Sequence, residues 1–409
     1  MHVATIDLSI HVSTSGRYFV DQTGEPFFWN GDTQWELFSK CAPSDARWIL
    51  DNRAAKGINV IQVMLTGLAG PGAVNKAGDK AFLHIDAATG KPDLARPNDR
   101  YFANVDSVVE HGRRKGIVFV IGLAHGWIRA WENHKDTARA YANWVAARYR
   151  DISNIVWVPS YTATPDMMKA LVSGILEGDG GKHLITVHPD PAVASSKEYH
   201  GESWLAFHSM QTWGSLADIY PMVTDLYRLT PPKPVVSAEG AYEAGTEYGF
   251  AVTPSIVRRQ AYWACLAGGF QSYGHNDSWR MLPTWKSALD APGASQVGVL
   301  RRFFASLDWW NLVPDQAVFE GGPPQGEALQ RSVAARSSKG EWIVAYLADP
   351  TTVSLALNKL TASRTAVAAW VDPRAGARTR MGEFPTTGAH SFTTPAGWED
   401  ALLLLERNP

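Results

Sequence analysis

Short hydrophobic runs recur along the first 280 residues, and each ends in polar residues before a helix-like pattern begins. The run FFWNGDT leads into a helical pattern near residues 43–56, and INVIQVMLTG follows Gly57, a residue typical of a helix end. Runs that are apolar along most of their length indicate strands buried on both faces of a parallel sheet. Eight such runs occur, at residues 27–33, 58–67, 117–127, 154–162, 183–190, 204–214, 233–243 and 268–279.

Eight strands alternating with helical segments, such as residues 136–151, predict an α/β fold of the TIM-barrel type, a (β/α)8 barrel. The competing architecture, a doubly wound open sheet, would need a ligand motif such as GxGxxG or GxxxxGK, and neither occurs. Residues 10–29 are hairpin-like, with Thr23-Gly24 as the turn. This hairpin would either cap the barrel floor or pair with the C-terminal region.

The pattern changes after about residue 315. The turn-rich segment GGPPQGE at residues 321–327 precedes short alternating stretches such as EWIVAYLA and VSLALNKL, without helical periodicity. Such stretches predict a small antiparallel β-sandwich. We therefore expect two domains, a catalytic barrel with its N-terminal hairpin at residues 1–315 and a β-sandwich at residues 316–409.

Composition narrows the classes of function. The net charge is −2 and no basic block occurs, which argues against a nucleic-acid partner. No apolar run reaches the roughly 18 residues of a membrane helix, and the N-terminus does not look like a signal peptide, so we expect a cytoplasmic protein without a membrane partner. Cys41 and Cys265 form no disulfide framework. The 17 tryptophans exceed ordinary core needs, and indole rings suit stacking on sugars.

Polar side chains follow nearly every predicted strand. In a TIM barrel the active site lies at the carboxyl ends of the strands, so these side chains would converge on one mouth. A polar pocket with aromatic walls suits a ligand with many hydroxyl groups. The candidate binding residues are Asp32, Trp35, Gln62, His125, Trp127, Tyr161, His188, His208, Gln211, His275, Asn276 and Asp277, together with the carboxylate of Glu239.

Most of these candidates have a structural alternative. Asp32 would also serve as a helix cap, His125 and His188 as core histidines, and Asn276-Asp277 as a turn. Glu239 is the sharpest catalytic candidate, because it is a carboxylate at the end of the apolar run PVVSA.

Histidines after four different strands permit a zinc hypothesis. The spacings HxH and HExxH are absent, however, so we expect no metal and no cofactor. A serine nucleophile is disfavoured because no GxSxG motif occurs.

Several motifs carry a family resemblance. They are PFFWNGDTQWELF (26–38), RAAKGINVIQV (53–63), ARAYANWVAARYRDISNIVWV (138–158), His188-Pro189, FHSMQ (207–211), AEGAYE (238–243), PGASQVGVLRRFF (292–304), WVDPRAG (370–376) and ALLLLE (401–406). The chain resembles the apiosidase-like glycoside hydrolases, glycoside hydrolase family 140. The resemblance implies a barrel followed by a β-sandwich and cleavage of glycosidic bonds by two carboxylates, one of them Glu239.

One position departs from the family pattern. The fourth strand typically ends Trp-x-Leu-Gly-Gly-Asp, and that aspartate is the expected acid/base, whereas this chain ends WVPSYT with Thr162 in its place. Asp166 is the first alternative acid, although it also suits an ordinary helix start. His188 or Asp32 is the second, and a substrate that needs little acid help is the third.

The sequence thus predicts a glycoside hydrolase acting on a plant- or microbe-derived oligosaccharide, with furanose-bearing ones among the expected substrates. Glu239 would be the nucleophile and Asp166 the acid/base. Two other interpretations stay open: a catalytically inactive barrel that binds carbohydrate, and a barrel enzyme of altered chemistry, such as a lyase or a metal-assisted hydrolase.

Overall fold

The computed structural model describes residues 8–324 and 326–408. Within residues 8–324, eight parallel strands form a curled sheet, and seven of the eight adjacent strand pairs are ladders in the order β8-β7-β6-β5-β4-β12-β11-β10. The eighth pair closes the ring, because Ile185 bridges Leu205 and accepts a 2.9 Å hydrogen bond from the amide of Ala206. The predicted barrel is therefore confirmed. Its strands are β4 (Asn30–Thr33), β5 (Val60–Met64), β6 (Val118–Gly122), β7 (Ile155–Val158), β8 (Leu184–Ile185), β10 (His208–Gln211), β11 (Val235–Glu239) and β12 (Phe270–Tyr273), with β9 (Val193–Ala194) antiparallel to β10.

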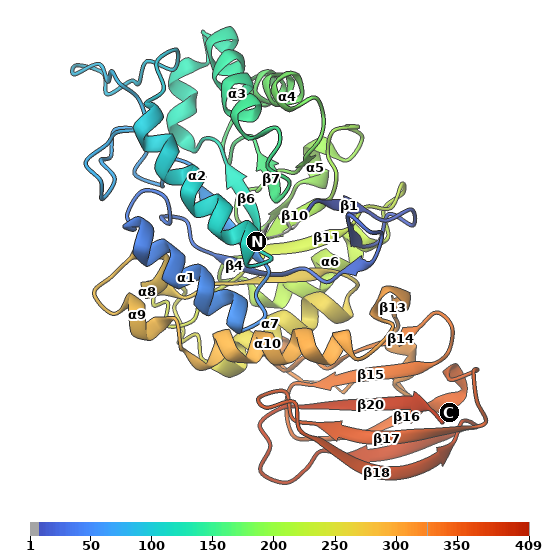
Figure 1. The fold of residues 1–409 in the computed structure, drawn as a ribbon. Helices are drawn as coiled ribbons and strands as arrows, with labels where there is room; N and C mark the ends of the chain where they lie inside the picture. Colours follow the sequence, from blue (N-terminus) through green and yellow to red (C-terminus); the bar gives the residue numbers. More distant parts are fainter. Residues whose placement is uncertain (1–7, 325, 409) are drawn as a thin grey trace, which may run out of the picture.

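Helices surround the sheet (Figure 1). They are α1 (Pro43–Ala55), α2 (Asp99–Arg114), α3 (Lys135–Tyr149), α4 (Pro165–Asp179), α5 (Ser196–Tyr199), α6 (Ile219–Tyr227), α7 (Pro254–Leu266), α8 (Asn276–Arg280), α9 (Trp285–Ala288) and α10 (Pro292–Ala305). Shorter 3-10 turns are η1 (Gly126–Trp131), η2 (Leu216–Asp218), η3 (Trp309–Asn311), η4 (Gln316–Val318), η5 (Ala328–Gln330) and η6 (Leu357–Lys359). The expected helices near 43–56 and 136–151 correspond to α1 and α3. Gly57 adopts φ +78° directly after α1, the left-handed conformation that favours glycine at a helix end. Among the described residues, no helix is both long and apolar enough to cross a membrane.

The N-terminal hairpin covers the amino end of the barrel. From residue 8 onward, β1 (Ile10–Val12), β2 (Phe19–Asp21) and β3 (Pro26–Phe27) form an antiparallel sheet. Phe19 is fully buried, and its ring lies 5.3 Å from Trp29, 5.1 Å from Phe207 and 5.6 Å from Phe270. Because these partners stand before or at the start of barrel strands, the hairpin takes the first of its two expected positions and closes the floor.

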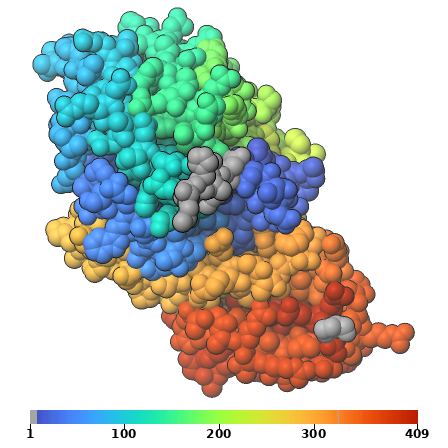
Figure 2. Space-filling model, in the orientation of Figure 1, coloured from blue at the N-terminus to red at the C-terminus, as the bar shows by residue number. Residues whose placement is uncertain are grey.

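A β-sandwich follows the barrel and lies against its α7–α10 side (Figures 1 and 2). In residues 312–324 and 326–408, a six-stranded antiparallel sheet has the order β13-β14-β15-β20-β17-β18, and β16 pairs with β19. The two sheets share a core that includes Ile343, Leu403, Val353 and Phe392. The strands are β13 (Leu312–Pro314), β14 (Val333–Ser337), β15 (Trp342–Leu347), β16 (Thr352–Ala356), β17 (Thr365–Val371), β18 (Arg378–Pro385), β19 (Ala389–Thr393) and β20 (Ala401–Arg407).

Helix α7 joins the two domains through a buried ion pair. Arg258 Nε donates to Asp400 Oδ2 at 2.8 Å, and Arg258 Nη2 donates to Oδ1 at 2.8 Å. The hydroxyl of Tyr346 donates to the same carboxylate at 2.7 Å, and the Tyr346 ring stacks on Tyr262 of α7 at 4.7 Å. The carboxylate therefore accepts three hydrogen bonds in an interface from which water is excluded.

Candidate active site

Glu239 is the last residue of β11, and its carboxylate is only 13% exposed. The ladder between β10 and β11 is irregular beside it, so Met210 pairs with Ser237 but Gln211 pairs with Glu239. Such an irregularity re-aims the side chain that follows it. The irregularity leaves the Glu239 carboxylate against His188, with Oε2 3.3 Å from Nε2.

Aromatic rings from other strand ends surround this contact. The Tyr161 ring lies 4.5 Å from the His188 ring, and Trp35 lies 5.5 Å from each of them, edge-on. His125 follows β6, and its ring is 5.9 Å from Tyr161. Five candidates from the sequence, after β4, β6, β7, β8 and β11, therefore meet at one end of the barrel.

A neighbouring carbonyl shows which ring nitrogen of His188 carries a hydrogen. Nδ1 lies 3.2 Å from the carbonyl oxygen of Pro189. A carbonyl only accepts, so Nδ1 carries a hydrogen. Nε2 faces the Glu239 carboxylate, without the alignment of a hydrogen bond. The Glu239 carboxylate and the His188 imidazole thus face each other across a 3.3 Å gap.

Unpartnered polar atoms gather around the same mouth. Buried polar atoms in proteins are nearly always hydrogen-bonded, so a group of them without protein partners indicates a place for water or ligand. Among the described residues these atoms include the Tyr161 hydroxyl, Thr162 Oγ1 and Thr212 Oγ1. Burial, and secondly the charge of Glu239, raise the pKa of Tyr161 well above its usual value. Tyr161 therefore stays a neutral hydroxyl at physiological pH.

Tyr242 and Trp213 also belong to this region, although the sequence did not single them out. The Trp35 indole donates to the Tyr242 hydroxyl at 2.7 Å, and burial followed by the Glu239 charge raises the pKa of Tyr242. Trp213 is two residues beyond Gln211, and its amide lies 3.4 Å from the carbonyl oxygen of Glu239. Their closeness in sequence to Glu239 and Gln211 was the available signal.

The side-chain amide of Gln62 supports the strand that carries Glu239. Gln62 Nε2 donates across the barrel to the carbonyl oxygen of Ala238 at 2.7 Å. Gln211 ends β10 and pairs in register with Glu239. We therefore assign Gln62 a positioning contact next to the mouth, while its expected contact with substrate stays a prediction.

Asp32 lies elsewhere, which corrects the expectation that it shares a concavity with Glu239. Its carboxylate is fully buried in a 2.5 Å ion pair with Arg53 of α1, and it also accepts from Gln34 at 2.8 Å. Side chains alternate along a strand, so Asp32 faces the helix layer when its neighbour Thr33 faces the barrel interior. The same placement removes Asp32 as an acid for the reaction.

Other candidates are held in structural contacts away from Glu239. His275 accepts from the amide of Asp277 and caps α8, while the carboxylate of Asp277 accepts from Asn276 and Thr284. Trp127 packs edge-on against Trp131, with its ring 6.3 Å from Tyr141. His275 thus caps a helix and Trp127 packs against neighbouring rings.

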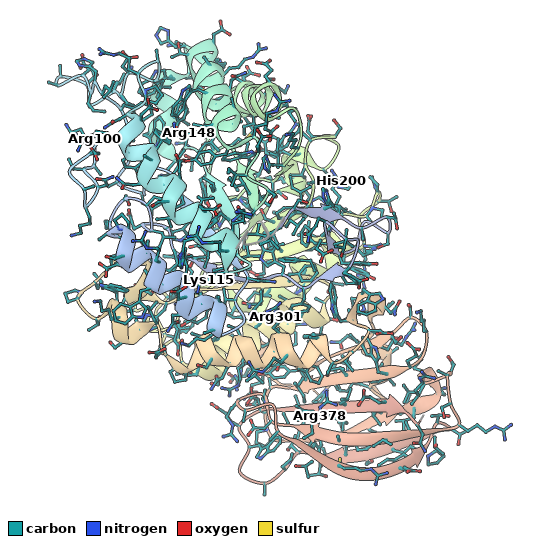
Figure 3. All side chains as sticks on the ribbon, viewed as in Figure 1. Arg100, Lys115, Arg148, His200, Arg301 and Arg378 are labelled. Atoms are coloured by element: carbon teal, nitrogen blue, oxygen red, sulfur yellow. The ribbon has the colours of Figure 1, made fainter. Side chains whose placement is uncertain are left out.

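His208 stands at the start of β10 rather than at its end. Its ring stacks on His200 at 5.2 Å, and His200 Nδ1 lies 3.2 Å from His208 Nε2 (His200 is labelled in Figure 3). The expectation that His208 follows its strand was therefore wrong, because the apolar run at 204–214 begins before the strand does.

Asp166, the first alternative to the acid that Thr162 replaces, lies at the start of α4. Asp166 is exposed in the first turn of α4, two residues after the N-cap Thr164, whose hydroxyl accepts from the Met167 amide at 3.3 Å. Carboxylates in a first helical turn complement the helix dipole. Among the described residues, no hydrogen bond or ion pair joins Asp166 to Glu239, and Asp166 has the surroundings of an ordinary helix start.

Among residues 8–324 and 326–408, no three His, Cys, Asp or Glu side chains are placed to hold a metal ion. His125 and His188 stand near Tyr161, whereas His208 and His275 are engaged elsewhere.

Solved structures resemble the whole chain. One described as a glycoside hydrolase has a TM-score of 0.86 at 25% identity, covering 98% of this chain and 97% of that one. A glycoside hydrolase family 5 structure from Bacteroides vulgatus ATCC 8482 has a TM-score of 0.86 at 24% identity, covering 98% of this chain and 93% of that one. Among curated proteins, none matches the chain.

Family models match both domains. The model described as "Putative collagen-binding domain of a collagenase" matches residues 313–406. The model described as "Apiosidase-like, catalytic domain" matches residues 13–311, well over half of the chain. The resemblance noted in the sequence is thereby confirmed, and the chain belongs to the apiosidase-like family of glycoside hydrolases.

Proposed function

We propose that this glycoside hydrolase cleaves an oligosaccharide with Glu239 as nucleophile and His188 as the group that delivers and recovers the proton. The observation that carries the proposal is the 3.3 Å contact between Glu239 Oε2 and His188 Nε2, at a mouth lined by unpartnered hydroxyls. These hydroxyls suit a polyhydroxylated substrate. The family's name favours a furanose-bearing oligosaccharide of plant or microbial origin as that substrate.

The reaction follows from this pair in two balanced steps. Glu239 attacks the anomeric carbon while the glycosidic C–O bond breaks and the leaving oxygen takes the proton from His188 Nε2. Water then attacks the same carbon, His188 takes its proton, and the ester bond to Glu239 breaks. Because each step inverts the configuration at the anomeric carbon, the two steps together retain it in the product. Imidazole suits both roles because its charge changes near neutral pH.

The nucleophile is tested by Glu239→Gln. The substitution keeps the shape of the side chain but removes the attacking carboxylate, so we expect kcat to fall by roughly 10⁴-fold or more while oligosaccharide binding, measured by calorimetry, persists. The matched control is Glu177→Gln, the same change at an exposed ion pair with Arg139 on the outer helices, which should leave kcat unchanged. If Glu239→Gln keeps full activity, Glu239 is not the nucleophile. If the wild-type protein binds oligosaccharides without cleaving any, the carbohydrate-binding interpretation takes its place.

The proton donor is tested by His188→Asn. Loss of general acid help lowers the rate by roughly 10²–10⁴-fold for substrates with poor leaving groups, and much less for aryl glycosides with good ones. We expect this contrast in kcat for His188→Asn. If Asp166→Asn shows the contrast and His188→Asn does not, Asp166 is the acid and the assignment of His188 fails.

A further inference from the structure

One exposed indole belongs to a residue whose backbone contacts the backbone of the proposed nucleophile. Trp213 follows β10 by two residues, and it is 40% exposed. An indole of this size in a core would be buried, so packing alone does not account for its position. The amides of Thr212 and Trp213 lie 3.0 Å and 3.4 Å from the carbonyl oxygen of Glu239. The backbone that carries the indole is therefore tied to the residue that carries the carboxylate.

The indole is also supported from one side. Its ring meets Tyr248 edge-on at 5.2 Å, and the Tyr248 hydroxyl accepts from the Tyr242 amide at 3.1 Å. Gly245 permits this packing, because a Cβ at that position would stand 2.5 Å from the Tyr248 ring. The supporting ring is thus held by the segment that follows Glu239, and the exposed part of the Trp213 indole faces solvent.

The backbone of Trp213 is strained. Its φ is +51°, in the left-handed region where bulky residues are rare. Glycine or asparagine would fill such a position with less strain. Strained residues that the surrounding contacts hold in place cluster at functional sites. Neither core packing nor the backbone conformation favours a tryptophan at this position. Binding of a ligand to its exposed ring accounts for the residue.

We propose that Trp213 is a stacking platform for a sugar ring next to the one that Glu239 attacks. The inference rests on the proposed role of Glu239, because the shared backbone contact attaches the platform to the strand end that carries that carboxylate. The apolar C–H face of a sugar packs on an indole, whereas its hydroxyls bind the polar atoms around it. The platform makes an oligosaccharide that extends beyond the cleaved bond a better substrate than a short glycoside.

The test compares oligosaccharides of one series that differ by a single sugar. The wild-type enzyme should have a lower KM for the longer member, and Trp213→Ala should raise that KM about tenfold while changing KM for the shortest aryl glycoside little. Trp213→Phe, which restores an aromatic face, should recover part of the loss. The control is Trp48→Ala, which removes a 50% exposed indole that packs on Trp285.

Failure of the platform can be distinguished from failure of the nucleophile. If Trp213→Ala leaves the length dependence intact while Glu239→Gln is inactive, the platform is refuted and the nucleophile stands. If Glu239→Gln is active, the nucleophile is refuted, and the KM values of the wild type and Trp213→Ala for the longer oligosaccharide still decide, because equal values refute the platform. A variant that misfolds is recognised by circular dichroism, and Trp213→Gly, which relieves the backbone strain, replaces it.

Discussion

Among single residues, His208 shows how a buried histidine is kept neutral. His200 Nε2 lies 2.9 Å from the Thr230 carbonyl oxygen, which only accepts, so that nitrogen carries a hydrogen. His200 Nδ1 then accepts from His208 Nε2, and His208 Nδ1 accepts from the Ser195 hydroxyl at 3.5 Å. Burial, and secondly the charge of His200, lower the pKa of His208 to about 4.

This pKa predicts a stability change in acid. The unfolded chain binds the proton at the usual value near 6.5 and the folded chain at about 4. The contribution of His208 to the free energy of unfolding is therefore fully present above pH 6.5. As the pH falls to 4, up to roughly 3 kcal/mol of this free energy is lost. In His208→Gln, the free energy of unfolding measured in urea should change less between pH 7 and pH 4 than in the wild type.

The control for that profile is His134→Gln, an exposed histidine before α3. It should leave the wild-type slope unchanged. Parallel slopes for wild type and His208→Gln would show that His208 does not titrate in this range.

At the level of elements, Glu243 attaches α10 to the barrel. The N-cap position of α10, Ala291, offers no side-chain cap. Glu243 Oε1 accepts from the amide of Gly293 at 3.1 Å, and Oε2 accepts from the Tyr273 hydroxyl at 2.5 Å. A carboxylate from the β11–α7 loop thus serves as the cap of a helix far along the chain.

Removal of this cap should destabilise the fold. Glu243→Leu leaves the Gly293 amide and the Tyr273 hydroxyl unsatisfied in a buried place, and we expect a loss of roughly 2–4 kcal/mol in chemical unfolding. Glu243→Gln keeps one acceptor oxygen and should lose less. In a double-mutant cycle, Glu243→Gln and Tyr273→Phe should be less than additive, and full additivity would contradict the shared contact.

The strand runs predicted the barrel because both faces of each strand are buried, and this same property hid part of the site. In such strands no alternation of polar and apolar residues marks which side faces the interior. Glu239 and Asp32 are both carboxylates near strand ends, yet Asp32 faces Arg53 and Glu239 faces His188. The hydrophobic pattern located the strands. Only the three-dimensional packing shows that Asp32 forms a buried ion pair, whereas Glu239 lies at the mouth of the barrel.

For the whole molecule, Arg258 makes barrel and sandwich depend on each other. It is almost fully buried in its pair with Asp400. Its neighbour Arg259 donates to the carbonyl oxygens of Leu329 and Ala348, and the Trp263 indole of α7 donates to that of Arg331. Because these hydrogen bonds and the ion pair all run from α7 to the C-terminal domain, we expect the barrel and the sandwich to unfold in one transition.

Asp400→Ala tests this dependence. It leaves the Arg258 charge buried without its partner, so we expect a loss of roughly 3–5 kcal/mol and one lowered melting transition for both domains in calorimetry. The control is Glu399→Ala, which removes a 55% exposed carboxylate from the same arginine and should lose at most about 1 kcal/mol. Two separate transitions, with the barrel unaffected, would contradict the expected dependence.

The position of α7 also fixes how the two domains are oriented relative to each other. The helix follows the loop after Glu239 and carries Arg258 into the sandwich, so no flexible tether separates the catalytic mouth from the C-terminal domain. A tethered module searches a surface while its catalytic partner stays engaged. Here the sandwich and the mouth keep one relative orientation, so a ligand bound to the sandwich would meet the mouth at a fixed angle.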